Sequence, residues 1–300
     1  MKRRSFLAMA GIAGLAVGGG VFAGSTATTT ALELIDLEVP IVDLPPEFDG
    51  YAIGLVADIH LGHYVSTELI ALGGDLLAAA RCDLLVLGGD YIWHPDEAKI
   101  WAKTNADFHA FTHSEVPAAV FERVAQIFTG RPPADGVVAV LGNHDGWIDP
   151  AACRQIFSRR GIEVLENRSH TIRRGDATLD VIGVADLWTG FPQIPPGAPR
   201  SPRHATVLVS HNPDFVSERL SEPGFAASLA VCGHTHGGQI RLPFGGVIFD
   251  NVDDKRFVSG LVHVGETAVF TSKGVGVVEI PLRVNCPPDV ARLVLRRHTS

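Results

Sequence analysis

Short apolar runs recur along the chain, and several of them stop at a cluster of polar residues. Residues 51–57, 83–87 and 137–141 are runs of this kind, bounded by Gly, Asp and Pro, and they predict buried strands. Ser66 or Thr67 caps a predicted helix that continues to residue 80, with Glu68 in its first turn. Because this helix connects the first two strands, we expect them to be parallel and joined by a right-handed crossover.

The same pattern continues to the C-terminus. We expect helices over residues 116–129 and 151–160, and a short helix that begins at Pro213. Further strands are expected near residues 162–165, 170–173, 179–184, 205–210 and 228–231. Residues 28–50 read as a linker and an amphipathic lead-in, and residues 239–300 alternate short β segments with Gly-rich turns, as in an antiparallel sheet. No interior linker divides residues 28–300, which predicts a single domain.

Two segments depart from regular elements. Residues 91–115 interleave tryptophan and phenylalanine with His94, His109 and His113. This insert forms either a lid that binds an apolar substrate or a packed surface excursion, since aromatic residues at helical spacing are usually core. Residues 190–202 form a Pro-rich loop that follows Trp188. His63 and His94 either touch substrate or are ordinary solvent-exposed side chains.

The N-terminus has the layout of a targeting segment. Lys2, Arg3 and Arg4 are followed by a Gly/Ala-rich apolar stretch to about residue 24. The paired arginines before Ser5-Phe6-Leu7 resemble a twin-arginine signal, which directs folded proteins to the twin-arginine translocase. We therefore expect residues 1–27 to be a signal peptide and residues 28–300 to reside in the periplasm or cell envelope, anchored to the membrane if the signal is not cleaved.

Composition and charge limit the partners. The chain is 46% hydrophobic, which is ample for a large core, and its formal net charge is −8. Without the first 27 residues the charge becomes −11, which disfavours nucleic acid as a partner. The four cysteines (Cys82, Cys153, Cys232 and Cys286) are scattered, so we expect buried free thiols, with a disulfide left open.

Five of the apolar runs end in residues that bind metals or turn the chain. These endings are Asp58-x-His60, Gly89-Asp90, Gly142-Asn143-His144-Asp145, His211 and Gly233-His234-Thr235-His236. Each one alone is compatible with a polar turn. In a doubly wound sheet, however, the carboxyl ends of the strands share one rim, so the five endings are expected to converge. Nitrogen and oxygen ligands without thiolate suit two divalent ions if one carboxylate bridges them, and such a pair assists phosphoryl displacement.

The last ending carries two histidines separated by Thr235. If residues 228–231 form a strand, alternation places His234 and His236 on the same face at its end. The flanking glycines allow the backbone to turn sharply at this point.

The order of these motifs resembles the calcineurin-like metallophosphoesterase superfamily and, within it, the bacterial exported branch of YaeI- and YkuE-like phosphodiesterases. Residues 233–243, 272–276 and 281–285 extend the resemblance, which runs from about residue 32 to residue 295. It implies an α/β fold, a four-layer sandwich of two mixed β-sheets flanked by helices, with the metals at the rim of strand ends.

The resemblance also implies a role for each residue. One ion is expected to bind Asp58, His60, Asp90 and His236, and the second Asp90, Asn143, His211 and His234, so that Asp90 bridges the pair. His144 is expected to stabilise the phosphoryl group or to protonate the leaving oxygen, and Asp145 to orient the His144 imidazole. Lys273 and Arg283 either reach a phosphate or are structural.

The function implied by the resemblance is a dimetal phosphodiesterase in which a metal-bridging hydroxide attacks a phosphorylated cell-envelope or lipid-linked substrate. A phosphomonoesterase, a nuclease and a non-catalytic metal-binding scaffold are the alternatives. Manganese is the expected metal, since folding before export lets the cytoplasm load the site, while iron and zinc also fit the ligands. We expect a monomer with peripheral membrane contact and no nucleic-acid partner.

Overall fold

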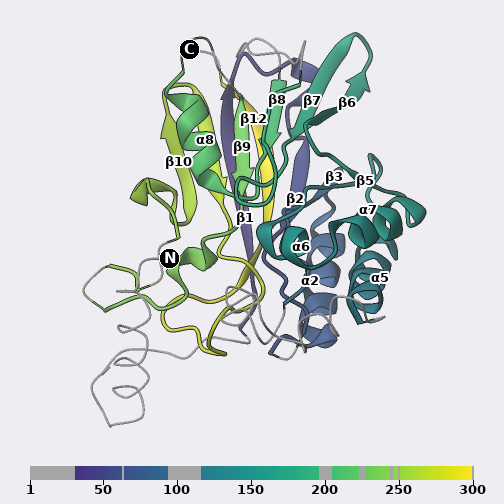
Figure 1. Cartoon of the computed structure of the whole chain (residues 1–300). Coiled ribbons are helices and arrows are strands. Elements are labelled where there is room, and N and C mark those ends of the chain that lie inside the picture. The colour runs from purple at the N-terminus through teal and green to yellow at the C-terminus, as the bar shows by residue number, and fades with distance from the viewer. Residues whose placement is uncertain are drawn as a thin grey trace.

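Two six-stranded β-sheets face each other and carry helices on their outer sides (Figure 1). This computed structural model describes residues 31–298, except residues 63, 94–115, 196–204, 223, 225–226, 244–245 and 249–250. The predicted signal peptide, most of the aromatic insert, His63, His94 and the end of the Pro-rich loop lie outside the described residues.

The first sheet has the strand order β1-β12-β2-β3-β4-β5. Its strands are β1 (Glu33–Val42), β12 (Asp289–His298), β2 (Ala52–Val56), β3 (Leu84–Leu87), β4 (Val137–Ala139) and β5 (Ile162–Val164). Strands β2 to β5 pair in parallel, as the helical crossovers between them require. β12 pairs antiparallel with β2 and parallel with β1, so the sheet is mixed.

The second sheet has the strand order β10-β11-β9-β8-β7-β6. Its strands are β10 (Gly260–Val264), β11 (Thr267–Thr271), β9 (Leu229–Cys232), β8 (Ala205–Val209), β7 (Ala177–Gly183) and β6 (Arg168–Arg174). The four inner strands are parallel, and β6 and β10 close the two edges as antiparallel hairpin partners.

Three of the helices begin after a residue whose side chain caps them. α2 (Thr67–Ala80) is capped by Ser66, whose side chain accepts a hydrogen bond from the Leu69 backbone N–H. α7 (Pro150–Arg159) and α8 (Pro213–Leu220) each have Pro at the first helical position after an Asp or Asn cap. The other helices are α5 (Val116–Thr129), α6 (Asn143–Ile148) and the short 3₁₀ turns η1 (Pro46–Phe48), η2 (His236–Gly238) and η3 (Lys255–Phe257).

Alternation along the central strands divides the core into three apolar zones. Leu84 and Val86 of β3 face the zone between the sheets, whereas Leu85 and Leu87 pack towards α2, α5 and α7. In the second sheet, β7 and β8 divide their side chains in the same way, and a third zone lies under α8. Three zones separate four layers, which confirms the predicted four-layer sandwich of two mixed sheets (Figure 1).

Two local expectations differ from the structure. The lead-in before residue 50 contains a strand, β1, which lies at the sheet edge where Pro40 costs no ladder hydrogen bond. The C-terminal region is not purely antiparallel, because β11 runs parallel to β9 and β12 returns to the first sheet beside β1. Which sheet a strand joins depends on long-range pairing, and the local pattern does not contain that information.

All four cysteines are free thiols, three of them buried and Cys82 half-buried, which confirms the expected unpaired state. Among the described residues, no helix has the length and apolar character needed to cross a membrane.

The zone between the sheets is expected to dominate stability. Leu55 is completely buried there, so Leu55→Ala should lower the free energy of unfolding by about 2–5 kcal/mol through lost burial and an unfilled cavity. Leu72, on the exposed side of α2, provides the matched control, and Leu72→Ala should change stability by no more than about 0.5 kcal/mol. Urea denaturation measures both, and equal effects would contradict this assignment of the core.

Candidate metal centre

The predicted site residues meet where strands of both sheets end. Asp58 and His60 follow β2, Asp90 follows β3, and Asn143, His144 and Asp145 form the first turn of α6 after β4. The second sheet supplies the remaining residues: His211 follows β8, and His234 and His236 follow β9. The structure therefore brings together all nine residues that the sequence singled out for metal binding or catalysis, on two facing sheets rather than on one rim.

Several of these residues have an unusual backbone conformation. Asp58, His60, Asp90, His234 and His236 all have φ between 47° and 71°, in the left-handed region that non-glycine residues rarely adopt. Such conformations cost free energy and persist where the surrounding structure imposes them, most often at functional sites. The local strain therefore supports a functional role for these turns.

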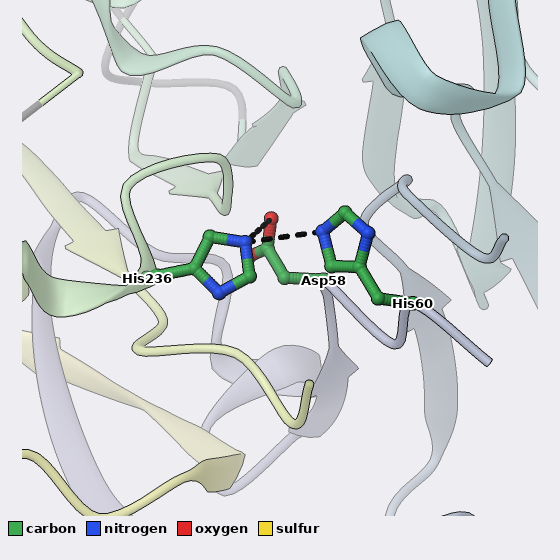
Figure 2. A group of neighbouring side chains, drawn as sticks. All are labelled: Asp58, His60 and His236. Carbon is green, nitrogen blue, oxygen red and sulfur yellow. Dashed lines mark hydrogen bonds and ion pairs between the residues drawn. The ribbon is translucent and has the colours of Figure 1, made fainter. Parts of the chain in front are cut away.

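One group consists of Asp58, His60 and His236 (Figure 2). The Nε2 atoms of His60 and His236 lie 3.1 Å apart, and His236 Nε2 lies 3.7 Å from Asp58 Oδ1. Both oxygens of Asp58 accept hydrogen bonds from the His234 backbone N–H, at 2.8 and 3.0 Å, which holds the carboxylate in place. Two imidazoles and a carboxylate oxygen thus point towards one another in a buried space.

A second group consists of Asp90, His211 and His234, with Asn143 beside it. Asn143 Oδ1 lies 3.2 Å from His211 Nε2 and 3.0 Å from His234 Nδ1. His211 Nδ1 lies 2.9 Å from the Gly88 carbonyl oxygen, so the Nε2 atom is the one that faces the group. A neutral amide oxygen adds a donor here without adding negative charge.

Asp90 links the two groups through one oxygen. Its Oδ2 lies 3.2 Å from His211 Nε2, 3.5 Å from His60 Nε2 and 3.9 Å from His144 Nε2. Its Oδ1 accepts a hydrogen bond from the His144 backbone N–H at 2.9 Å. A single carboxylate oxygen therefore stands between the predicted ligand sets, as a bridging ligand must.

His144 lies at the mouth of the cluster. Its side chain is 9% exposed, compared with 0% for His60 and His211 and 4% for His236. Its ring makes an edge contact with His60, with the centroids 4.4 Å apart, and lies 5.2 Å from the ring of Trp147. It is therefore the most accessible imidazole of this set to a group that approaches from solvent.

Asp145 is buried and is hydrogen-bonded to backbone. Its Oδ2 accepts hydrogen bonds from the N–H groups of Asp90 and Gly142, and its Oδ1 accepts one from Tyr91. These contacts join the loop after β3 to the start of α6 and so fix the position of Asp90. The role expected for Asp145 next to the His144 imidazole stays a prediction.

Two further residues support the site: Tyr91, which the sequence did not single out, and Arg283, for which it left a phosphate contact and a structural role open. The Tyr91 hydroxyl, with its single O–H donor, lies within hydrogen-bond distance of the carbonyl oxygens of Leu87, at 2.9 Å, and Val140, at 2.5 Å, and so links the ends of β3 and β4. Arg283 is fully buried and donates to backbone carbonyls of Lys273, Gly274 and Gly276, and of His236 at 3.3 Å. Arg283 is therefore structural, and its pattern of carbonyl partners arises only from the tertiary fold.

Burial and mutual charge set the protonation of the cluster. Burial lowers the pKa of His60 and His236 well below the usual range and that of His234 to about 3, so these imidazoles are neutral. Burial opposes charge on Asp90, but His211 and His144 hold its pKa well below the ordinary value. Burial alone would lower the pKa of His211, yet Asp90 raises it to about 10.

These donors fit divalent cations. Within each group the ligand atoms lie within 4.8 Å of one another. Neutral imidazoles, carboxylates and an amide oxygen are the donors that Mn²⁺, Fe²⁺ and Zn²⁺ accept, and His211 would have to release its proton when an ion binds. Burial raises the pKa of Asp58 to about 7, and a bound cation would favour its carboxylate form. The expectation of divalent metal binding is therefore consistent with the geometry, and the identity of the metal stays a prediction.

Strand alternation, which the sequence suggested for His234 and His236, does not determine where these two side chains point. β9 ends at Cys232, so both histidines lie beyond the strand, His234 in a left-handed turn and His236 at the start of η2. Gly233 precedes them because a Cβ there would lie 2.6 Å from Asp58 Oδ2. The turn, and not strand alternation, directs the two imidazoles into different groups.

Comparison with known proteins adds independent information. Residues 51–238 match the calcineurin-like phosphoesterase family. The chain is 33% identical to phosphodiesterase YaeI of Escherichia coli over 249 residues, which cover 82% of each protein. It is 27% identical to the uncharacterized metallophosphoesterase YkuE of Bacillus subtilis, across 99% of this chain and 98% of that one. Among solved structures, the sulfate thiohydrolase SoxB of Thermus thermophilus aligns with a TM-score of 0.43 at 15% identity, over 82% of this chain and 58% of that one.

The two groups should lose metal separately. His236→Ala removes a donor next to Asp58 and His60, and His234→Ala removes one next to His211. The wild type is expected to bind two ions, and each variant should retain about one. His263→Ala, at an exposed position of β10, is the matched control and should retain both. Metal analysis of the purified variants measures this, and loss of both ions from either variant would contradict independent groups.

Asp145 should act on metal affinity through Asp90. In the wild type, three backbone N–H groups donate to the Asp145 carboxylate. Asp145→Asn would replace one carboxylate oxygen by an NH₂ group, which cannot accept these hydrogen bonds. The loop that carries Asp90 should therefore shift, and metal affinity should fall about 10- to 100-fold. Competition with a chelating dye measures the affinity. Asp176→Asn, in the exposed turn between β6 and β7, should leave it unchanged. Equal affinities for the two variants would rule out this supporting role.

Proposed function

Because the chain belongs to the calcineurin-like phosphoesterase family and is a metal-dependent phosphoester hydrolase, we propose that it is a phosphodiesterase that acts on a phosphorylated cell-envelope or lipid-linked substrate. The ester is thus proposed to be a diester, the substrate a lipid or cell-envelope molecule, and the location the cell envelope. A phosphomonoesterase is the second candidate, because both activities use the same kind of centre.

The observation that carries the proposal is the position of Asp90 Oδ2 between two sets of nitrogen and oxygen donors. Asp58, His60 and His236 lie on one side of it, and Asn143, His211 and His234 lie on the other. Two divalent ions bound to these sets would supply Lewis acidity, lowering the pKa of water and neutralising charge on phosphoryl oxygens. A site with one donor set would lack this arrangement.

The residues of the chain prepare the centre for this reaction. Asp58 and Asp90 are held by backbone N–H groups, so they are already oriented before a substrate arrives. Burial of the imidazoles keeps bulk water away from the donors. His144, at the mouth and within 3.9 Å of Asp90 Oδ2, is placed to donate a hydrogen bond to the phosphoryl group or a proton to the leaving oxygen.

Similarity to a relative named as a phosphodiesterase supports a diester over a monoester. The twin-arginine-type pattern of residues 2–7 supports export to the periplasm or cell envelope, and thus a substrate found there. Loading of the site before export supports manganese. The acidic charge of the chain supports a substrate other than nucleic acid. We propose a monomer that contacts the membrane peripherally.

Turnover of chromogenic esters tests the proposal. With Mn²⁺ added, the wild type should hydrolyse bis-p-nitrophenyl phosphate faster than p-nitrophenyl phosphate, and a chelator should abolish both reactions. His144→Ala should lower kcat about 10²- to 10⁴-fold, because the proton donor is lost while the metal ligands stay. Bound metal in the His144→Ala variant is measured as the control.

Three outcomes would contradict parts of the proposal. Absence of metal-dependent turnover on either ester would leave only a binding role for the centre. Preference for the monoester would favour the phosphomonoesterase. Full activity of His144→Ala would remove His144 from the reaction.

A further inference from the structure

Aromatic side chains continue outward from the candidate metal centre. The Trp188 ring makes an edge contact with His234, with the centroids 4.5 Å apart. It also stacks with Trp147 at 6.1 Å and an interplanar angle of 29°, and Trp147 lies beside His144. Trp188 is 48% exposed and Phe191, in the same loop, is 85% exposed. We call Trp147, Trp188 and Phe191 the aromatic subsite.

The loop that carries Trp188 and Phe191 is held in place by polar side chains. Asn167 donates to the Phe191 carbonyl at 2.9 Å and accepts from the N–H groups of Ala185 at 3.0 Å and Gln193 at 2.8 Å. Inside the loop, between the residues that Asn167 binds, the buried Asp186 carboxylate accepts hydrogen bonds from the N–H groups of Trp188 and Thr189, both at 2.9 Å, and from the Thr189 hydroxyl. The exposed aromatic rings are therefore on a fixed backbone.

The same loop is packed directly against α6. A Cβ at Gly146, two residues after His144, would collide with the Thr189 side chain, so only glycine allows this close approach. α6 carries Asn143 and His144, and the loop carries Trp188. The position of Trp188 relative to the candidate centre is thus determined by direct contact and not by a long connection.

Exposed aromatic patches on fixed loops mark ligand-binding surfaces. A ligand that covered the Trp188 ring would lie next to the candidate metal centre, because the ring contacts His234. We propose that the aromatic subsite binds a hydrocarbon chain of a lipid phosphodiester, on the part of the substrate that stays attached to phosphorus. This inference rests on the proposed phosphodiesterase function.

Two features favour a chain over a single flat ring. Rings from both α6 and the loop make up the subsite, and those of Trp147 and Trp188 lie 6.1 Å apart, so the apolar surface is wider than a single ring. Trp188 and Phe191 also present exposed indole and phenyl rings, which offer apolar contact to a hydrocarbon chain. The chain is assigned to the retained group because the exposed indole of Trp188 reaches the centre through His234, whereas the less exposed Trp147 is the ring beside His144.

A series of p-nitrophenyl diesters tests the subsite. Methyl, butyl and octyl p-nitrophenyl phosphate share one leaving group and differ only in the retained chain, and each is used below its micelle concentration. Full burial of a methylene multiplies kcat/KM by about fourfold, so partial burial should give a rise of at least about tenfold from methyl to octyl. Trp188→Ala and Phe191→Ser should each reduce that rise to about threefold or less.

Matched variants separate the proposal from a general defect. Leu72→Ser removes an exposed hydrophobic side chain on α2, 45% exposed, and should retain the full rise with chain length. Trp188→Leu retains an apolar surface without a flat ring, so it should keep more of the rise than Trp188→Ala.

The outcomes distinguish failure of this inference from failure of the function. Absence of turnover on every ester would overturn the phosphodiesterase itself. Turnover that is independent of chain length in the wild type would overturn the aromatic subsite alone. Preference for phenyl p-nitrophenyl phosphate over the octyl ester, with Trp188→Leu as poor as Trp188→Ala, would replace the hydrocarbon chain by a stacked ring.

Discussion

A buried negative charge on Asp90 is the constraint on which the centre depends. The Asp90 carboxylate is buried, and its lost hydration is compensated by the fold. His60, His144 and His211 lie around Oδ2, and a backbone N–H donates to Oδ1. A buried carboxylate without such partners would become protonated or would destabilise the fold. Divalent cations bound to these donors would complete the compensation, and metal binding would then be coupled to the geometry of the loops through this one side chain.

The loops around Asp90 have little freedom because each is held by another. Asp145 ties the loop after β3 to α6, the His234 backbone holds Asp58, and Arg283 holds the turn at His236. Left-handed backbone at five of the proposed ligands is tolerated only with this support. Backbone hydrogen bonds thus hold the donor atoms in position, against the repulsion between neighbouring carboxylates and between neighbouring imidazoles.

The same α6 that brings Asn143 and His144 to the centre also contacts the loop of Trp188. The proposed catalytic residue His144 and the proposed substrate contact Trp147 therefore lie on the same short helix. The Trp147 indole lies beside the His144 imidazole and stacks with the indole of Trp188. In the proposed enzyme, the buried polar centre would carry out the reaction, and the exposed aromatic surface next to it would select the substrate. Differences between related enzymes are expected in such loops, where change does not disturb the donors.

The sequence by itself determined the strand endings and the chemistry of their residues. Apolar runs stopping at Asp58, Asp90, Asn143, His211 and His234 are local features, and the motif order identifies the family, the two-sheet fold and the nature of the donors. The tertiary structure decided which sheet each strand joins, why β12 returns to β1, and how the turn after β9 divides His234 from His236. It also decided the support given by Asp145, Arg283 and Asn167, because their partners are backbone groups brought near only by long-range folding. Local patterns encode which side chains are present, whereas pairings distant in sequence encode what each one touches.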